Sequence, residues 1–142
     1  METKKFFMNK LVRDKSVEIL KKRGCVKIEH YALDDNEDFL AALAEKIVEE
    51  LEEVFDSESR EEMIEELADI EEVLVAFKEL VEISQAEVDA IRKKKREEKG
   101  GYSERVFIEY VDAKVGSPAY EYAKKQEEKY PEVDVEEDED AE

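Results

Sequence analysis

Four acidic residues, Glu50, Glu53, Glu66 and Asp69, have the types and the spacing that suit metal-ion chemistry. They form two i,i+3 pairs in the runs VEELEEV and EELADI. On a helix that advances about 100° per residue, Glu66 falls on the apolar stripe of its segment, and Glu50 sits at the rim of its own. A carboxylate that faces a helical core is costly unless it is paired or bound to a cation. Brought together by an antiparallel hairpin, the two pairs predict an all-oxygen cation site.

Oxygen ligands of this kind suit Mg²⁺ or Mn²⁺, whereas zinc prefers Cys and His. The alternative is that a chain with 42 Asp and Glu residues acquires such pairs by chance. Two pairs on adjoining segments, both turned toward apolar stripes, favour the metal site over chance.

Basic residues gather around the pair Gly100–Gly101. Cationic side chains beside a flexible turn with an exposed backbone can hold phosphate oxygens. Complementation of a helix dipole explains the same run equally well. Metal-assisted cleavage of a pyrophosphate bond requires an acidic metal site together with basic residues that bind phosphate. The basic cluster comprises Arg92, Lys93, Lys94, Lys95, Arg96, Lys99 and Arg105, and a smaller patch near the start comprises Lys10, Arg13 and Lys15.

Composition limits the kinds of protein that this chain can be. Its 142 residues suggest one domain with an appendage, and four Gly, two Pro and 46% charged residues favour helices. The formal net charge of -19 argues against a duplex nucleic-acid partner, because phosphate contacts need Lys and Arg. The single cysteine fits a reducing compartment, and no apolar run is long enough to span a membrane or to form a signal peptide. We therefore expect a cytoplasmic protein without a membrane partner.

Apolar periodicity and cap residues predict the elements that must position these side chains. The expected fold is all-α, a four-helix-bundle-like body with short extended segments, whose apolar faces meet within the chain or across a dimer. The residues 1–108 form that body, 109–130 an extension, and 131–142 an acidic, disordered tail. We expect helices at about 13–23, 36–55, 59–82 and 84–99, extended segments at 25–33 and 105–111, and a short helix at 119–130.

Four segments in this order resemble a known family: KLVRDKSVEIL, KIVEELEEV, EELADIEEVL and KKKREEKGGYSERV. Together they are similar to the MazG-like, phosphoribosyl-ATP pyrophosphohydrolase-like branch of the all-α nucleoside triphosphate pyrophosphatases. The metal motif of that family, EExxE followed by ExxD, is matched by Glu49-Glu50-x-x-Glu53 and Glu66-x-x-Asp69. The resemblance covers about residues 8–108 and leaves the rest of the chain without a role.

This resemblance implies a Mg²⁺-dependent enzyme that hydrolyses a nucleoside triphosphate, or a related nucleotide, to a monophosphate and pyrophosphate. It also implies a helical bundle that forms a homodimer or homotetramer. Lys99 and Tyr102 stand where the family commonly has Arg and Phe, so bidentate phosphate recognition by Arg is lost there. The implied metal ligands are Glu50, Glu53, Glu66 and Asp69, the catalytic candidates are Glu49 and Glu50, and the candidates for phosphate contacts are Lys99, Arg96 and Arg105, followed by Arg13 and Lys15.

Two other functions are compatible with the same residues. Within the same class, the chain could be a phosphoribosyl-ATP pyrophosphohydrolase of histidine biosynthesis. From a different class, it could be a non-catalytic helical interaction protein whose acidic tail binds a basic partner.

Overall fold

The computed structural model describes residues 1–134, and within them it contains five α-helices and no β-strand. The all-helical prediction is therefore confirmed. Residues 135–142, which include most of the tail predicted to be disordered, lie outside the described part. None of the helices within residues 1–134 combines the length and the apolarity that crossing a lipid bilayer requires.

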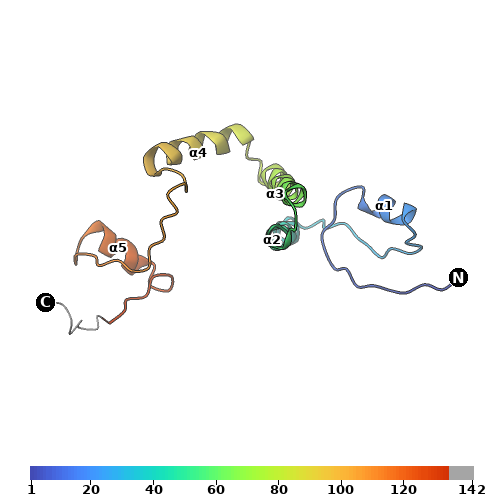
Figure 1. The fold of residues 1–142 in the computed structure, drawn as a ribbon, viewed down its shortest axis with the longest axis horizontal. Coiled ribbons are helices and arrows are strands. Elements are labelled where there is room, and N and C mark those ends of the chain that lie inside the picture. Colours follow the sequence, from blue (N-terminus) through green and yellow to red (C-terminus); the bar gives the residue numbers. More distant parts are fainter. Residues whose placement is uncertain (135–142) are drawn as a thin grey trace. The chain divides into compact units, whose positions relative to one another are not determined.

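The helices follow one another along the chain in two compact units (Figure 1). The first unit covers Met1–Gly100 and contains four helices, and the second begins at Gly101 and contains one in its described residues. The bounds are α1 Ser16–Lys22, α2 Asn36–Asp56, α3 Arg60–Val81, α4 Gln85–Lys99 and α5 Pro118–Lys125. All five lie within or close to the predicted helical segments.

Side-chain caps fix where these helices begin. The Asp35 carboxylate accepts a hydrogen bond from the Asp38 backbone N–H (3.0 Å) at the start of α2. At the start of α4, Ser84 and Glu87 form a capping box, in which each side chain accepts from the other residue's backbone N–H. Such bonds satisfy the free N–H groups of a first helical turn.

At the start of α3 a capping box forms only in part. The Ser59 hydroxyl accepts from the Glu62 backbone N–H (3.1 Å), as expected. The Glu62 carboxylate, however, accepts from the N–H of Glu58 (2.9 Å), one residue before the cap. The Glu58 N–H belongs to the three-residue connection Ser57–Ser59. The start of α3 is therefore still held by two hydrogen bonds to side chains.

Neither of the extended segments expected at 25–33 and 105–111 forms a strand. Strands are stable only when neighbours complete their hydrogen-bond ladders. The described residues offer no such neighbour, so alternating apolar residues alone leave these segments as extended connections.

The α2–α3 hairpin is the only helix pair with extensive packing in the described chain, and it contains the core (Figure 1). Leu43 of α2 is 2% exposed, and Val73 of α3 is the other buried apolar residue. Two helices alone can cover only a narrow seam, so a four-helix bundle is not formed by these contacts and stays a prediction.

Many large apolar side chains of the hairpin are consequently exposed. Several of them follow a stripe on each helix at a spacing of three, four or seven residues, the pattern of a face that packs against another helix. The stripe comprises Val48, Leu51 and Phe55 on α2 and Met63, Leu67 and Leu74 on α3.

The burial of Leu43 gives a test of the hairpin. We expect Leu43→Ala to lower the free energy of unfolding by about 2–5 kcal/mol, because it removes buried methyl groups and leaves a cavity. The matched control is Leu51→Ala on the same helix, which should cost about 1 kcal/mol in a chain that does not assemble, because Leu51 is half exposed there. Urea unfolding measures both. A cost below about 1 kcal/mol at Leu43 would contradict the hairpin core, whereas a large cost at Leu51 would show that an assembly covers it.

Candidate metal centre

Three carboxylates from the two helices of the hairpin meet at one point. Glu50 and Glu53 lie one turn apart on α2, and Glu66 faces them from α3. Each offers an oxygen atom, and these oxygens lie within 4.8 Å of one another, close enough to share one metal ion. The structure therefore brings together three of the four predicted ligands.

Glu50 is the most unusual member of this group because it is only 4% exposed. One of its carboxylate oxygens, Oε2, is buried without a hydrogen-bond partner in the described residues, and so is Oε2 of Glu66. Leaving such an oxygen unsatisfied costs about 1–3 kcal/mol or more. An acceptor can be satisfied only by a proton donor or by a cation, so the burial points to one of these two partners.

A proton is one possible partner, and Glu66 is the group that takes it up. A hydrogen bond with Glu53, followed by burial, a hydrogen bond with Glu50 and the charges of both carboxylates, raises the pKa of Glu66 to about 7. Ionised carboxylates have no hydrogen to share, which explains why Glu66 Oε2 lacks a partner until one of them is protonated. Three acidic groups at this distance cannot all be ionised at low cost.

A lysine supplies positive charge to one side of the cluster. Lys46 Nζ lies 3.2 Å from Glu50 and 3.3 Å from Glu49, one helical turn away from both along α2. Burial lowers the pKa of Lys46, but hydrogen bonds to Glu50 and Glu49 and their charges outweigh it and raise the pKa overall. Lys46 was not among the predicted site residues. The i,i+3 and i,i+4 spacing from Lys46 to the two glutamates was the signal that could have identified it.

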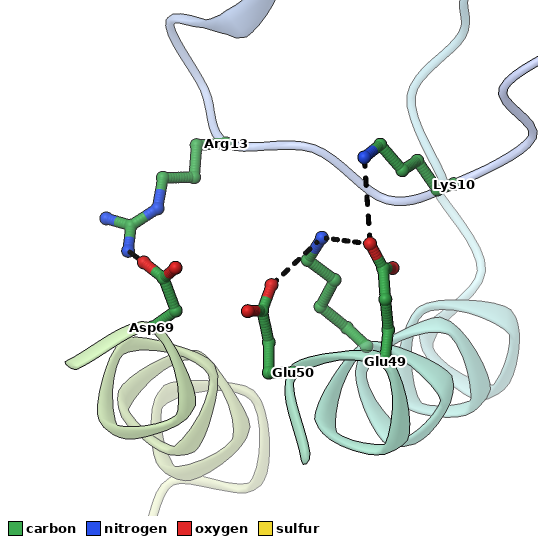
Figure 2. A network of polar contacts seen from close by, with 6 residues as sticks. Lys10, Arg13, Glu49, Glu50 and Asp69 are labelled. Carbon is green, nitrogen blue, oxygen red and sulfur yellow. Dashed lines mark hydrogen bonds and ion pairs between the residues drawn. The ribbon is translucent and has the colours of Figure 1, made fainter. Parts of the chain in front are cut away.

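The other cations near the cluster come from the N-terminal segment (Figure 2). Arg13 pairs with Asp69 of α3 at 2.5 Å, and Lys10 pairs with Glu49 of α2 at 3.6 Å. Asp69, the fourth predicted ligand, therefore faces a guanidinium and does not belong to the group of three oxygens. Arg13, a predicted phosphate contact, lies beside the acidic cluster.

No Lys or Arg of the described chain pairs with Glu53 or Glu66. The positive charges gather instead on Glu49, Glu50 and Asp69. The uncompensated negative charge is thus concentrated where Glu53 and Glu66 meet the buried Glu50. A small divalent cation would have its most favourable electrostatic energy at that place.

Four predicted phosphate contacts are not brought to this cluster by any contact in residues 1–134. Lys15 precedes α1, and Arg96 and Lys99 lie in the last turn of α4. Arg105 belongs to the second unit and adopts a positive φ of 55°. The role of these four residues stays a prediction.

The chemistry of the group is that of a hard-cation site. Carboxylate oxygens from two rigid helices, with one ligand deeply buried and one at the surface, can hold a metal ion and leave coordination positions open.

The raised pKa of Glu66 predicts how stability depends on pH without metal. The protonated form is favoured by folding, so this stabilisation is present below the usual pKa of 4.5 and is lost as the pH rises through about 7. Glu66→Gln stays neutral, so in chelator it should melt a few degrees higher than the wild type at pH 8 but not at pH 5. Glu65→Gln, an exposed neighbour on α3, is the control. Equal melting temperatures for Glu66→Gln and wild type at pH 8 would contradict the clustered carboxylates.

Comparison with family models, with curated proteins and with solved structures found no match for this chain.

Proposed function

We propose that the protein is a Mg²⁺-dependent nucleotide pyrophosphohydrolase, which releases a nucleoside monophosphate and pyrophosphate. The observation that supports this most is the buried Glu50, which has one carboxylate oxygen without a hydrogen-bond partner and lies in the same oxygen group as Glu53 and Glu66. The ordered resemblance to the MazG-like family adds the reaction and the substrate class. Mn²⁺ would serve in place of Mg²⁺, because both prefer oxygen ligands.

In this proposal Glu50, Glu53 and Glu66 hold the ion, and Asp69 joins them from the next turn of α3. An ion held there would supply positive charge to the phosphate chain and would lower the pKa of a water molecule. Glu49 lies at the rim, partly exposed, where it can orient that water and accept its proton. No Ser, Cys or His nucleophile is needed for this reaction.

The substrate phosphates would lie on the side of the cluster from which Lys10 and Arg13 approach (Figure 2). Arg is suited to phosphate because its planar guanidinium donates two parallel hydrogen bonds. Lys15, Arg96, Lys99 and Arg105 would complete the phosphate contacts from flanking segments or from a second subunit.

A homodimer or homotetramer is part of the same proposal. The exposed apolar stripes of α2 and α3 would pack against those of another copy and complete a four-helix bundle. A large cost of Leu51→Ala in the unfolding experiment is the result that would support this assembly.

A non-catalytic interaction protein is the competing function of a different class. It explains the acidic composition, but it gives no reason to bury Glu50 beside two further carboxylates. Phosphoribosyl-ATP pyrophosphohydrolase activity is the alternative within the same class, and a substrate panel separates it from the leading proposal.

Pyrophosphate release from a panel of nucleotides with Mg²⁺ tests the proposed activity. The panel includes the common triphosphates and phosphoribosyl-ATP. We expect Glu50→Gln and Asp69→Asn each to reduce the rate by on the order of 10²-fold or more, since each removes a proposed ligand. Glu65→Gln, which makes the same charge change on the exposed face of α3, should keep the wild-type rate. Absence of release by the wild type with every nucleotide, or wild-type rates in both ligand variants, would refute the catalytic proposal.

Metal binding can be tested without any substrate. We expect millimolar Mg²⁺ or Mn²⁺ to raise the melting temperature of the wild type, because an ion that binds only the folded state stabilises it by about 2.7 kcal/mol at 100 times its Kd. Glu50→Gln should lose most of this increase, while Glu65→Gln should keep it. An equal increase in Glu50→Gln would place the ion elsewhere.

A further inference from the structure

The N-terminal segment 10–13 contacts both helices that carry the acidic cluster. Lys10 reaches Glu49 on α2, and Arg13 reaches Asp69 on α3 (Figure 2). The two cations therefore bridge the hairpin on the side where the carboxylates lie.

Little else attaches this segment to the hairpin. Among residues 1–15 only Leu11 is partly buried, and all the others are exposed. Within the described chain, residues 1–12 make no backbone–backbone hydrogen bond, since the earliest such bond joins the Ser16 N–H to the Arg13 carbonyl. Lys10 and Arg13 are 39% and 60% exposed, so water and salt weaken both ion pairs.

The ion pairs Lys10–Glu49 and Arg13–Asp69 compete with a divalent cation for the negative charge of the carboxylates. Asp69 Oδ1 faces the Arg13 guanidinium and cannot offer the same lone pair to a metal ion. A doubly charged ion at Glu50, Glu53 and Glu66 would also repel both cations across the hairpin. Arg13 in turn has fewer free donors for a phosphate while its Nη2 is held by Asp69. Opening the pair thus frees Asp69 Oδ1 for a metal ion and the whole guanidinium for a phosphate.

We propose that residues 10–13 form a counter-ion strap, which pairs with Glu49 and Asp69 beside the group Glu50, Glu53 and Glu66 until a divalent cation displaces it. This inference rests on the proposed metal site. Lys46 differs from the strap because it is only 16% exposed and lies one turn from Glu50 on the same helix, so it stays in place. Displacement leaves Lys10 and Arg13 free beside the bound ion, where phosphate groups of a substrate would lie. Metal binding thus frees the two cationic side chains that then bind the phosphate groups.

The test compares Mn²⁺ affinity of three proteins by isothermal titration calorimetry without nucleotide. The strap variant is Lys10→Gln with Arg13→Gln. The control is Lys4→Gln with Lys5→Gln, which removes the same charge from side chains that pair with Glu2 and Glu29 instead. We expect the strap variant to bind Mn²⁺ roughly three- to tenfold more tightly than the wild type, as the loss of two weak competing pairs implies. The control should stay within about twofold of the wild type.

A second measurement uses the unmodified chain. Trypsin cleaves after Lys and Arg only when the side chain is free to enter the protease. The rate of cleavage after Arg13, relative to cleavage after Lys5, should rise when Mn²⁺ is added to the wild type. Mass spectrometry of the fragments reports the ratio, so any effect of Mn²⁺ on trypsin itself cancels.

The outcomes separate the strap from the metal site. Equal or weaker Mn²⁺ binding by the strap variant, or an unchanged cleavage ratio in a wild type that binds Mn²⁺, would overturn the strap and leave the metal site standing. Binding by the strap variant alone would support a strap that keeps the site closed. If none of the three proteins binds Mn²⁺, the proposed metal site fails and the strap fails with it.

Discussion

The burial of one carboxylate, Glu50, is the constraint on which the rest of the site depends. The hairpin packs its apolar seam around Leu43 and Val73, and the same packing draws Glu50 out of water. An ionised group in that position needs compensation of several kcal/mol from its neighbours. Its nearest carboxylates, Glu53 and Glu66, increase the cost because they carry the same charge. Whatever else the hairpin does, it must supply positive charge at this point.

Three kinds of group bring positive charge to these carboxylates, and they differ in how firmly they are held in place. Lys46 is local to α2, shielded from water, and lies beside Glu50 whenever the helix forms. The proton on Glu66 is available only below about pH 7. Lys10 and Arg13 arrive from a segment with little other attachment, on carboxylates at the rim. Neither Lys46, Lys10 nor Arg13 forms an ion pair with Glu53 or Glu66 in the described chain. A single divalent ion could contact all three central carboxylates at once and would offset two of their three negative charges.

Local signals in the sequence were sufficient to predict the helices and the central carboxylates. Caps such as Ser84 with Glu87 and a 3.6-residue apolar period depend on neighbours a few positions away. The meeting of Glu50, Glu53 and Glu66 followed from the same period and a short connection. The pairing of Arg13 with Asp69 joins residues 56 positions apart and depends on the path of an irregular segment, which no periodicity encodes. The extended segments at 25–33 and 105–111 do not become strands for the same reason, because a strand requires a partner that local sequence cannot supply.

The exposed apolar stripes bear on the chemistry of the site as well as on assembly. Leu51 directly follows Glu50 on α2, and Leu67 directly follows Glu66 on α3, so each stripe is turned by about 100° from a proposed ligand. Glu53, the exposed member of the oxygen group, comes two positions after Leu51 and is turned from it by about 200°, to nearly the opposite side of α2. An assembly that covers the stripes would therefore leave Glu53 open to water and to a substrate. The hairpin can thus use one side for assembly and keep the other for a cation.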